Sequence, residues 1–106
     1  VTTARADFAQ NDRAVIERQA EGFAKLVLDS RGRILGATIV GAHAGELIQP
    51  WAMALAQRTK LSAMAAMTVA YPTLSEIGKR AAGNFYAPLI FSRRARMLAR
   101  MLSLFG

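Results

Sequence analysis

The chain contains no cysteine among its 106 residues, which excludes disulfides, a thiol nucleophile and a thiolate metal site within it. No apolar run approaches the roughly 18 residues that a membrane-spanning helix needs. The N-terminus also lacks the basic segment and apolar core of a signal peptide. From these absences we expect a cytoplasmic protein. Because the first residue is Val1 rather than methionine, we also expect a fragment of a longer protein.

Acidic residues are missing from the C-terminal third. Up to Glu76, eight basic and seven acidic residues nearly cancel, whereas the segment after Glu76 holds six basic residues and no acid. The net charge of +7 therefore belongs to the C-terminal segment rather than to the whole chain. With 53% hydrophobic and 20% charged residues, the composition is that of one globular domain over residues 1–106.

Three short runs have the pattern of β-strands. Residues 3–8 alternate small or apolar with polar side chains, which is typical of a half-buried strand. Residues 23–29 and 33–41 are rich in β-forming residues and flank Ser30-Arg31-Gly32. Because Gly32 accepts a positive φ angle at little cost, these two runs are predicted to form a hairpin.

Helical spacing begins at Ala44. Apolar residues at three- and four-residue steps predict a helix ending near Arg58, and Pro50 predicts a kink or a later start. A short second helix is predicted over 62–67, with Ser62 as its N-cap. A third helix is predicted from Thr73 to about residue 82, where Gly83-Asn84 stops it. This order predicts an α+β domain, an antiparallel sheet with helices packed on one side and a core over about residues 3–83.

The sharpest local signal lies at Tyr71-Pro72-Thr73 and Glu76. Pro72 prevents a helix from running through this point and pushes Tyr71 toward extended geometry. Thr73 and Glu76 have the spacing of a capping box, in which the threonine hydroxyl accepts from the Glu76 amide and the carboxylate reaches back to the Thr73 amide. Tyr71 is therefore expected on a corner just outside a capped helix, where it can contact a partner.

This corner resembles the His-Pro-Thr-x-x-Glu motif of the C-terminal dimerisation, or interface, domain of the FAD-dependent pyridine nucleotide-disulfide oxidoreductases. That family includes dihydrolipoamide dehydrogenase and mercuric reductase. Other stretches resemble family signatures in the same order over about residues 8–83. They are Phe8-x-x-Asn11-x-Arg13-Ala14, Gly22-Phe23-x-Lys25, Ile34-Leu35-Gly36-Ala37 and Ile39-Val40-Gly41-Ala42-x-Ala44-Gly45-Glu46-Leu47-Ile48.

The resemblance implies an interface domain that forms a homodimer within a larger oxidoreductase. FAD and NAD(P) would be held by other domains of the parent chain, so this fragment alone is expected to bind no cofactor and to be inactive. It implies the same α+β fold, a cis Tyr71-Pro72 bond, and interface positions for Pro72, Thr73, His43 and Trp51. Neither a metal site nor a nucleic-acid partner is expected.

The same resemblance places Tyr71 and Glu76 at the family's catalytic positions, where histidine is the base for the partner subunit's redox-active disulfide and glutamate orients it. Tyr71 replaces that histidine, and a phenol with a pKa near 10 is a poor proton acceptor at neutral pH. Mercuric reductases resemble this chain in carrying tyrosine here, where it serves the metal substrate. Two alternatives stay open: Tyr71 lines the site or only packs at the interface, and Glu76 acts chemically or, as we favour, only caps the helix.

The remaining candidates are the single histidine, His43, and the C-terminal tail, residues 84–106. A lone histidine without cysteine is a poor metal site, and no G-x-G-x-x-G segment is present. Helical spacing over 92–105 separates two faces. The apolar face contains Met97, Leu98, Met101, Leu102 and Phe105, and the other face contains Arg93, Arg96 and Arg100. The tail is interpreted as a partner-packing helix, a membrane-surface helix or a nucleic-acid-binding helix. The alternative function is thus a stand-alone basic domain that binds nucleic acid or an anionic membrane.

Overall fold

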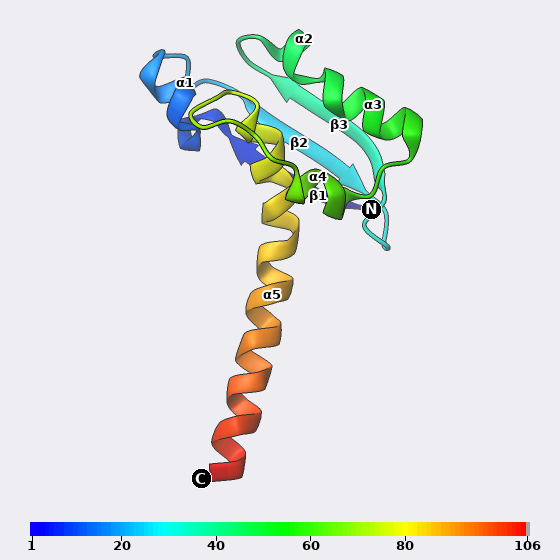
Figure 1. Cartoon of the computed structure of the whole chain (residues 1–106), viewed down its shortest axis with the longest axis vertical. Coiled ribbons are helices and arrows are strands. Elements are labelled where there is room, and N and C mark those ends of the chain that lie inside the picture. The colour runs from blue at the N-terminus through cyan, green and yellow to red at the C-terminus, as the bar shows by residue number, and fades with distance from the viewer. Residues whose placement is uncertain (106) are drawn as a thin grey trace.

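A three-stranded antiparallel sheet forms the centre of the fold, in the order β1-β2-β3 (Figure 1). The structure is a computed structural model that describes the backbone of residues 1–105 and the side chains of residues 1–88, 97 and 100. The strands are β1 (Thr2–Asp7), β2 (Phe23–Leu28) and β3 (Ile34–Val40). The predicted first strand and hairpin are confirmed.

One face of the sheet is buried and the other is open. Ala4 of β1 pairs with Leu26 of β2, and Ala6 pairs with Ala24. All four side chains are buried, as is Leu28, whereas Arg5 and Lys25, one residue along, are exposed. This alternation follows from the two-residue period of a strand, which sends successive side chains to opposite faces.

Asp29 organises the β2–β3 turn. Its carboxylate accepts the backbone amides of Arg31 (2.8 Å) and Arg33 (2.9 Å) and the Nε of Arg33 (2.6 Å). The hydrogen bond from the Arg33 amide is the main cause that holds the pKa of the Asp29 carboxyl below its ordinary value. Gly32 has a φ of 78°, the conformation that the sequence predicted for this position.

Short helices lie between β1 and β2 and between β3 and the last helix. Before β2 lie η1 (Phe8–Gln10) and α1 (Asp12–Ile16), and after β3 come α2 (Ala44–Leu47), α3 (Gln49–Gln57) and α4 (Leu61–Ala66). The expected effect of Pro50 is confirmed, because it lies in the first turn of α3, where its missing N–H costs no helical hydrogen bond. Ser62 as an N-cap was wrong: Lys60 is the extended residue that precedes α4.

The last helix, α5 (Glu76–Phe105), is much longer than predicted. It runs through Gly83-Asn84 and Pro88, so the expected stop of the helix at residue 83 was wrong. A helical glycine costs only about 1 kcal/mol, and the Asn84 side chain donates to the Arg5 carbonyl of β1 (2.9 Å) rather than capping the helix. The predicted apolar and arginine faces lie outside the described side chains, apart from Met97 and Arg100, which are both exposed.

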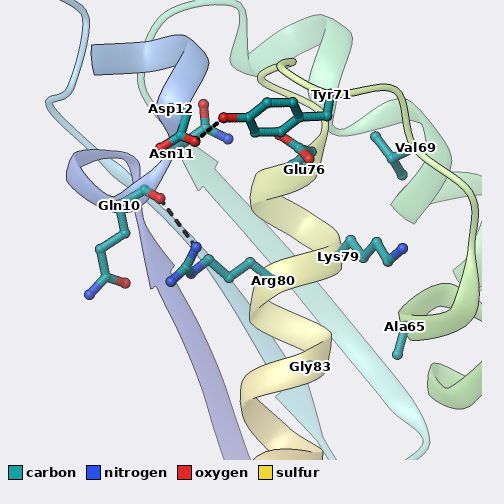
Figure 2. Close-up of a pocket in the computed structure, with 10 residues that line it drawn as sticks. All are labelled: Gln10, Asn11, Asp12, Ala65, Val69, Tyr71, Glu76, Lys79, Arg80 and Gly83. Atoms are coloured by element: carbon teal, nitrogen blue, oxygen red, sulfur yellow. Dashed lines mark hydrogen bonds between the residues drawn. The ribbon is translucent and has the colours of Figure 1, made fainter. Parts of the chain in front are cut away.

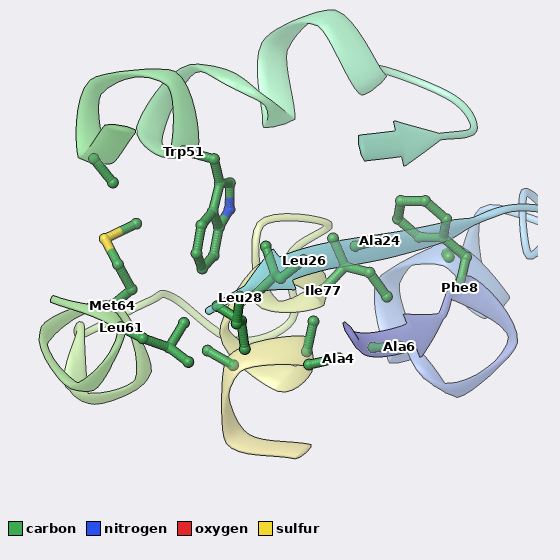
Figure 3. Close-up of a cluster of buried hydrophobic side chains, with 14 residues drawn as sticks. Ala4, Ala6, Phe8, Ala24, Leu26, Leu28, Trp51, Leu61, Met64 and Ile77 are labelled. Carbon is green, nitrogen blue, oxygen red and sulfur yellow. The ribbon is translucent and has the colours of Figure 1, made fainter. Parts of the chain in front are cut away.

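The first turns of α5 close the core over β1 and β2 (Figure 3). Ile77, Ala81 and Ala82 have exposures of 1% or less, and the alanines allow the helix to approach the alanine-rich strands closely. Trp51 of α3 points into the same core and is 2% exposed. The indole fills the space above Gly78, where an added Cβ would lie 2.3 Å from the indole Nε1. Trp51 is thus a core residue of the single chain, and its interface position stays a prediction.

Candidate functional site

The corner that carries Tyr71 connects α4 to α5. The Tyr71-Pro72 peptide bond is cis, as expected, and the Tyr71 side chain is 70% exposed. Half of the predicted capping box is present, since Oε2 of Glu76 accepts the Thr73 amide (3.4 Å). The other half was wrong: the Thr73 hydroxyl donates to the Ala70 carbonyl (2.6 Å), and the Glu76 amide donates to the Thr73 carbonyl (3.4 Å). Glu76 thus caps the helix start.

Asn11 fixes the backbone of this corner from the other end of the chain. Its Oδ1 accepts the amide of Ala14 (2.9 Å) and so caps α1, while its Nδ2 donates to the carbonyl of Thr73 (3.1 Å). Asn11 is 4% exposed and is a buried polar residue. Because both ends of its amide are satisfied, its burial costs little, and α1 and the corner are joined.

Asp12, the next residue, holds the Tyr71 side chain. The phenolic hydroxyl donates to Oδ2 of Asp12 (Figure 2). This hydrogen bond is the largest cause that raises the pKa of the Tyr71 phenol, followed by the charge of Asp12, partial desolvation and the charge of Glu76. Each of these favours the neutral phenol over the phenolate. Tyr71 is therefore protonated at neutral pH.

A pocket of about 350 Å³ lies beside Tyr71, between α1 and α5. Figure 2 shows Asp12 and Tyr71 on one side of it and Arg80 and Lys79 projecting from α5. Arg80 Nη1 donates to the carbonyl of Gln10 (3.3 Å), which joins α5 to η1. The pocket therefore combines the exposed phenol with two cations and two carboxylates, those of Asp12 and Glu76.

The structure brings only part of the predicted site together. Tyr71 and Glu76 line the same pocket, and Pro72 and Thr73 are half-buried beside them. His43 lies on the separate β3–α2 connection, exposed, with a φ of 61° and no side-chain cap for α2. His43 thus lies on a loop, and its predicted interface position stays a prediction, whereas Trp51 is buried in the core.

Asn11 and Asp12 are the residues of this site that sequence reasoning missed. Asn11 caps α1 and Asp12 begins it, but these local roles account for only half of their contacts. Nothing in the local pattern indicates a partner 59 or 62 residues away in the sequence. The resemblance over Phe8 to Ala14 was the one signal that could have drawn attention to Asn11.

Metal and membrane signals are lacking in the described part of the chain. No group of three or more His, Asp or Glu side chains among the described residues is placed to hold a metal ion. Nor does any helix there combine the length and hydropathy required to cross a bilayer.

Comparison with known proteins identifies the type of domain. The family model described as pyridine nucleotide-disulphide oxidoreductase, dimerisation domain, matches residues 1–82. The chain is 42% identical over 78 residues to a dihydrolipoyl dehydrogenase of Synechocystis, covering 73% of this chain and 16% of that protein. It is 40% identical over 86 residues to a dihydrolipoyl dehydrogenase of Corynebacterium glutamicum, covering 78% of this chain and 18% of that one.

The fold comparison agrees. A crystal structure of LpdA from Mycobacterium tuberculosis is similar with a TM-score of 0.75 and 31% sequence identity, covering 81% of this chain and 19% of that chain. The predicted α+β fold, an antiparallel sheet with helices, is thereby confirmed. The chain spans less than a fifth of the length of each of these three proteins.

Proposed function

The chain belongs to the pyridine nucleotide-disulphide oxidoreductase family as its dimerisation domain, and on that basis we propose that its Tyr71 corner lines the partner subunit's redox site in a homodimeric parent enzyme. The observation that carries this proposal is the exposed Tyr71 on a corner whose backbone is fixed by Asn11 and Glu76. An exposed side chain on a backbone that is held in place is suited to contact a second subunit.

Tyr71 would act in that site as a hydrogen-bonding residue rather than as a base. The raised pKa of its phenol keeps it protonated at neutral pH, and an efficient general base needs a pKa near the working pH. Glu76 is engaged with the Thr73 amide, which supports the capping interpretation of that carboxylate. The parent enzyme would therefore differ from family members that use histidine here.

FAD and NAD(P) are proposed for the other domains of the parent. A dinucleotide site of the usual kind needs parallel strands and a glycine-rich strand-to-helix turn, and the three described strands are antiparallel. The described residues therefore do not form a dinucleotide site of that kind, and the chain alone is expected to be inactive. The parent reaction would pass electrons between a nicotinamide, FAD and an active-site disulfide, with a substrate still to be identified.

The test of the Tyr71 assignment is Tyr71→His in the full-length parent. Because histidine restores a group with a pKa near 6.5, we expect both kcat and its pH dependence to change, with dihydrolipoamide among the substrates assayed. Val15→Ala, at an exposed position of α1, is the matched control and should leave turnover unchanged. Unchanged turnover of Tyr71→His with every substrate would contradict the proposal.

Membership of the dimerisation-domain family implies a homodimer, and α3 offers a surface for it. Met53 is 68% exposed on this helix although Trp51 and Ala54 beside it are buried. We propose that Met53 lies in the dimer interface. Sedimentation equilibrium of the 106-residue chain should give the mass of a dimer at both low and high salt. Met53→Glu should convert this dimer to a monomer. A wild-type monomer would mean that the parent's other domains supply essential contacts.

The far part of α5 supports a second proposal, contact with an anionic membrane surface, on the sequence pattern of its residues 92–105. The helical backbone does continue to Phe105, as that proposal requires. Sedimentation with anionic vesicles, compared with neutral ones, tests it.

The cytoplasmic location stays a prediction that cell fractionation would check. No finding on the described residues favours the nucleic-acid alternative.

A further inference from the structure

We infer that Asp12 is a positioning residue for Tyr71. Its carboxylate accepts the hydrogen bond of the phenolic hydroxyl and so sets both the direction of the ring and the side of the phenolic oxygen that is left free for a ligand. This inference rests on the proposed function of Tyr71 and deepens it. It assigns to the site a residue from α1, which lies far from the corner in the sequence.

The first support is that both partners are held on rigid backbone. Asp12 is the first residue of α1, whose start is capped by the buried Asn11. Asn11 also donates to the Thr73 carbonyl, two residues beyond Tyr71. The backbones that carry the carboxylate and the phenol are therefore joined independently of the Tyr71–Asp12 hydrogen bond, and that bond orients a side chain between two fixed points.

The second support is the charge distribution around the phenol. Asp12 faces it from α1, while Glu76, Lys79 and Arg80 line the same pocket from α5. Glu76 is engaged by the Thr73 amide and Arg80 by the Gln10 carbonyl. Asp12 is thus the carboxylate that receives the phenol, and it is placed to select the orientation of the O–H bond.

The chemical consequence concerns what the phenol offers to a ligand. A tyrosine hydroxyl has one proton to donate and two lone pairs that accept. Because the proton is directed to Asp12, the outward side of the Tyr71 oxygen is an acceptor. The matching ligand group is therefore a hydrogen-bond donor, such as a thiol S–H or a protonated amine, rather than a carboxylate.

The experiment uses the 106-residue chain with 13C at tyrosine Cζ. NMR should give separate signals for the two tyrosines, assigned with Tyr71→Phe, and Tyr86 serves as an internal reference. Asp12→Asn is compared with Asp7→Asn, which removes the same charge from a position paired with Arg5. Asp12→Asn should shift the Tyr71 signal at neutral pH and lower its titration toward the pKa of an ordinary phenol. Asp7→Asn should change neither.

A Tyr71 signal that behaves identically in Asp12→Asn and wild type, at neutral pH and through its titration, would overturn the inference. If Asp12→Asn unfolds the chain, Tyr71→Phe gives the answer from the other side: NMR of the Asp12 carboxylate carbon should then shift, while that of Asp7 should not. An unmoved Asp12 carboxylate would equally contradict the contact.

Activity of the parent enzyme gives an independent readout. If Asp12 acts through Tyr71, Asp12→Asn should lower kcat/KM in the wild-type background and have no further effect in the Tyr71→Phe background. Equal losses in both backgrounds would show that Asp12 does not act through Tyr71. A silent Tyr71→Phe, together with the NMR shifts above, would instead mean that the positioning contact exists but that the proposed site-lining function is wrong.

Discussion

The two parts of α5 share one helical backbone but are stabilised in different ways. The N-terminal part, residues 76–86, packs against the sheet and α4, with Ile77, Ala81 and Ala82 buried. The C-terminal part extends away from the sheet (Figure 1), and Met97 on it is 62% exposed. Tertiary packing therefore supports the first part, whereas the second depends on helix propensity and on any partner it meets.

This difference shows that the end of packing and the end of a helix are separate events. A methyl group added at Gly83 would meet no atom within 4 Å, and Pro88 lies inside the helix. Both residues weaken a helix locally, yet the backbone continues past them. The glycine that was predicted to stop the helix thus lies inside it, and Phe85 and Tyr86 beyond it still pack against the core.

The largest expected effect comes from emptying the packed part. Ile77→Ala should lower the free energy of unfolding by about 2 to 5 kcal/mol, because a buried aliphatic side chain leaves a cavity. The matched change in the extended part, Met97→Ala, should have almost no effect on it. Urea unfolding of both variants measures the contrast. Equal losses would mean that the far part of α5 is packed as tightly as the first.

A second contrast uses glycines from the packed part and its edge. Gly78→Ala should destabilise the fold by roughly 1 to 3 kcal/mol, because the new methyl group meets the Trp51 indole. Gly83→Ala should instead stabilise it by up to about 1 kcal/mol, since its methyl position is open and alanine is the better helix former. Thermal unfolding followed by circular dichroism checks both signs. A destabilising Gly83→Ala would contradict the open surroundings of the methyl position at residue 83.

The smallest effect is expected from removing the extended part. Deleting residues 89–106 should leave the urea midpoint of the core unchanged while reducing the helical signal in circular dichroism. Pro88→Ala, in the full chain, should raise that signal, because proline removes a helical hydrogen bond and alanine restores it. A core that unfolds earlier after the deletion would show that the two parts of α5 are energetically coupled.

Much of this fold could be predicted from local patterns. The strands follow from the two-residue period of their side chains. The turn at Gly32 and the start of α3 beside Pro50 follow from the backbone preferences of glycine and proline. The length of α5 could not, because Asn84 uses its side chain to bind the Arg5 carbonyl across the fold instead of ending the helix. In the site, Tyr71 and Glu76 were visible as a local motif, whereas Asp12 was not, because its contact is with a residue 59 positions away.

The buried amide of Asn11 has a further consequence for how the domain opens. One side chain holds both the first turn of α1 and the corner at Thr73, so unfolding of α1 also weakens a hydrogen bond that fixes the corner. The two segments should therefore exchange their amide protons with solvent as one cooperative unit. Any event that loosens α1 would remove the Asn11 contact from the Tyr71 corner and leave it held by Glu76 and Ala70 alone, so the order of the corner depends in part on a helix only one turn long.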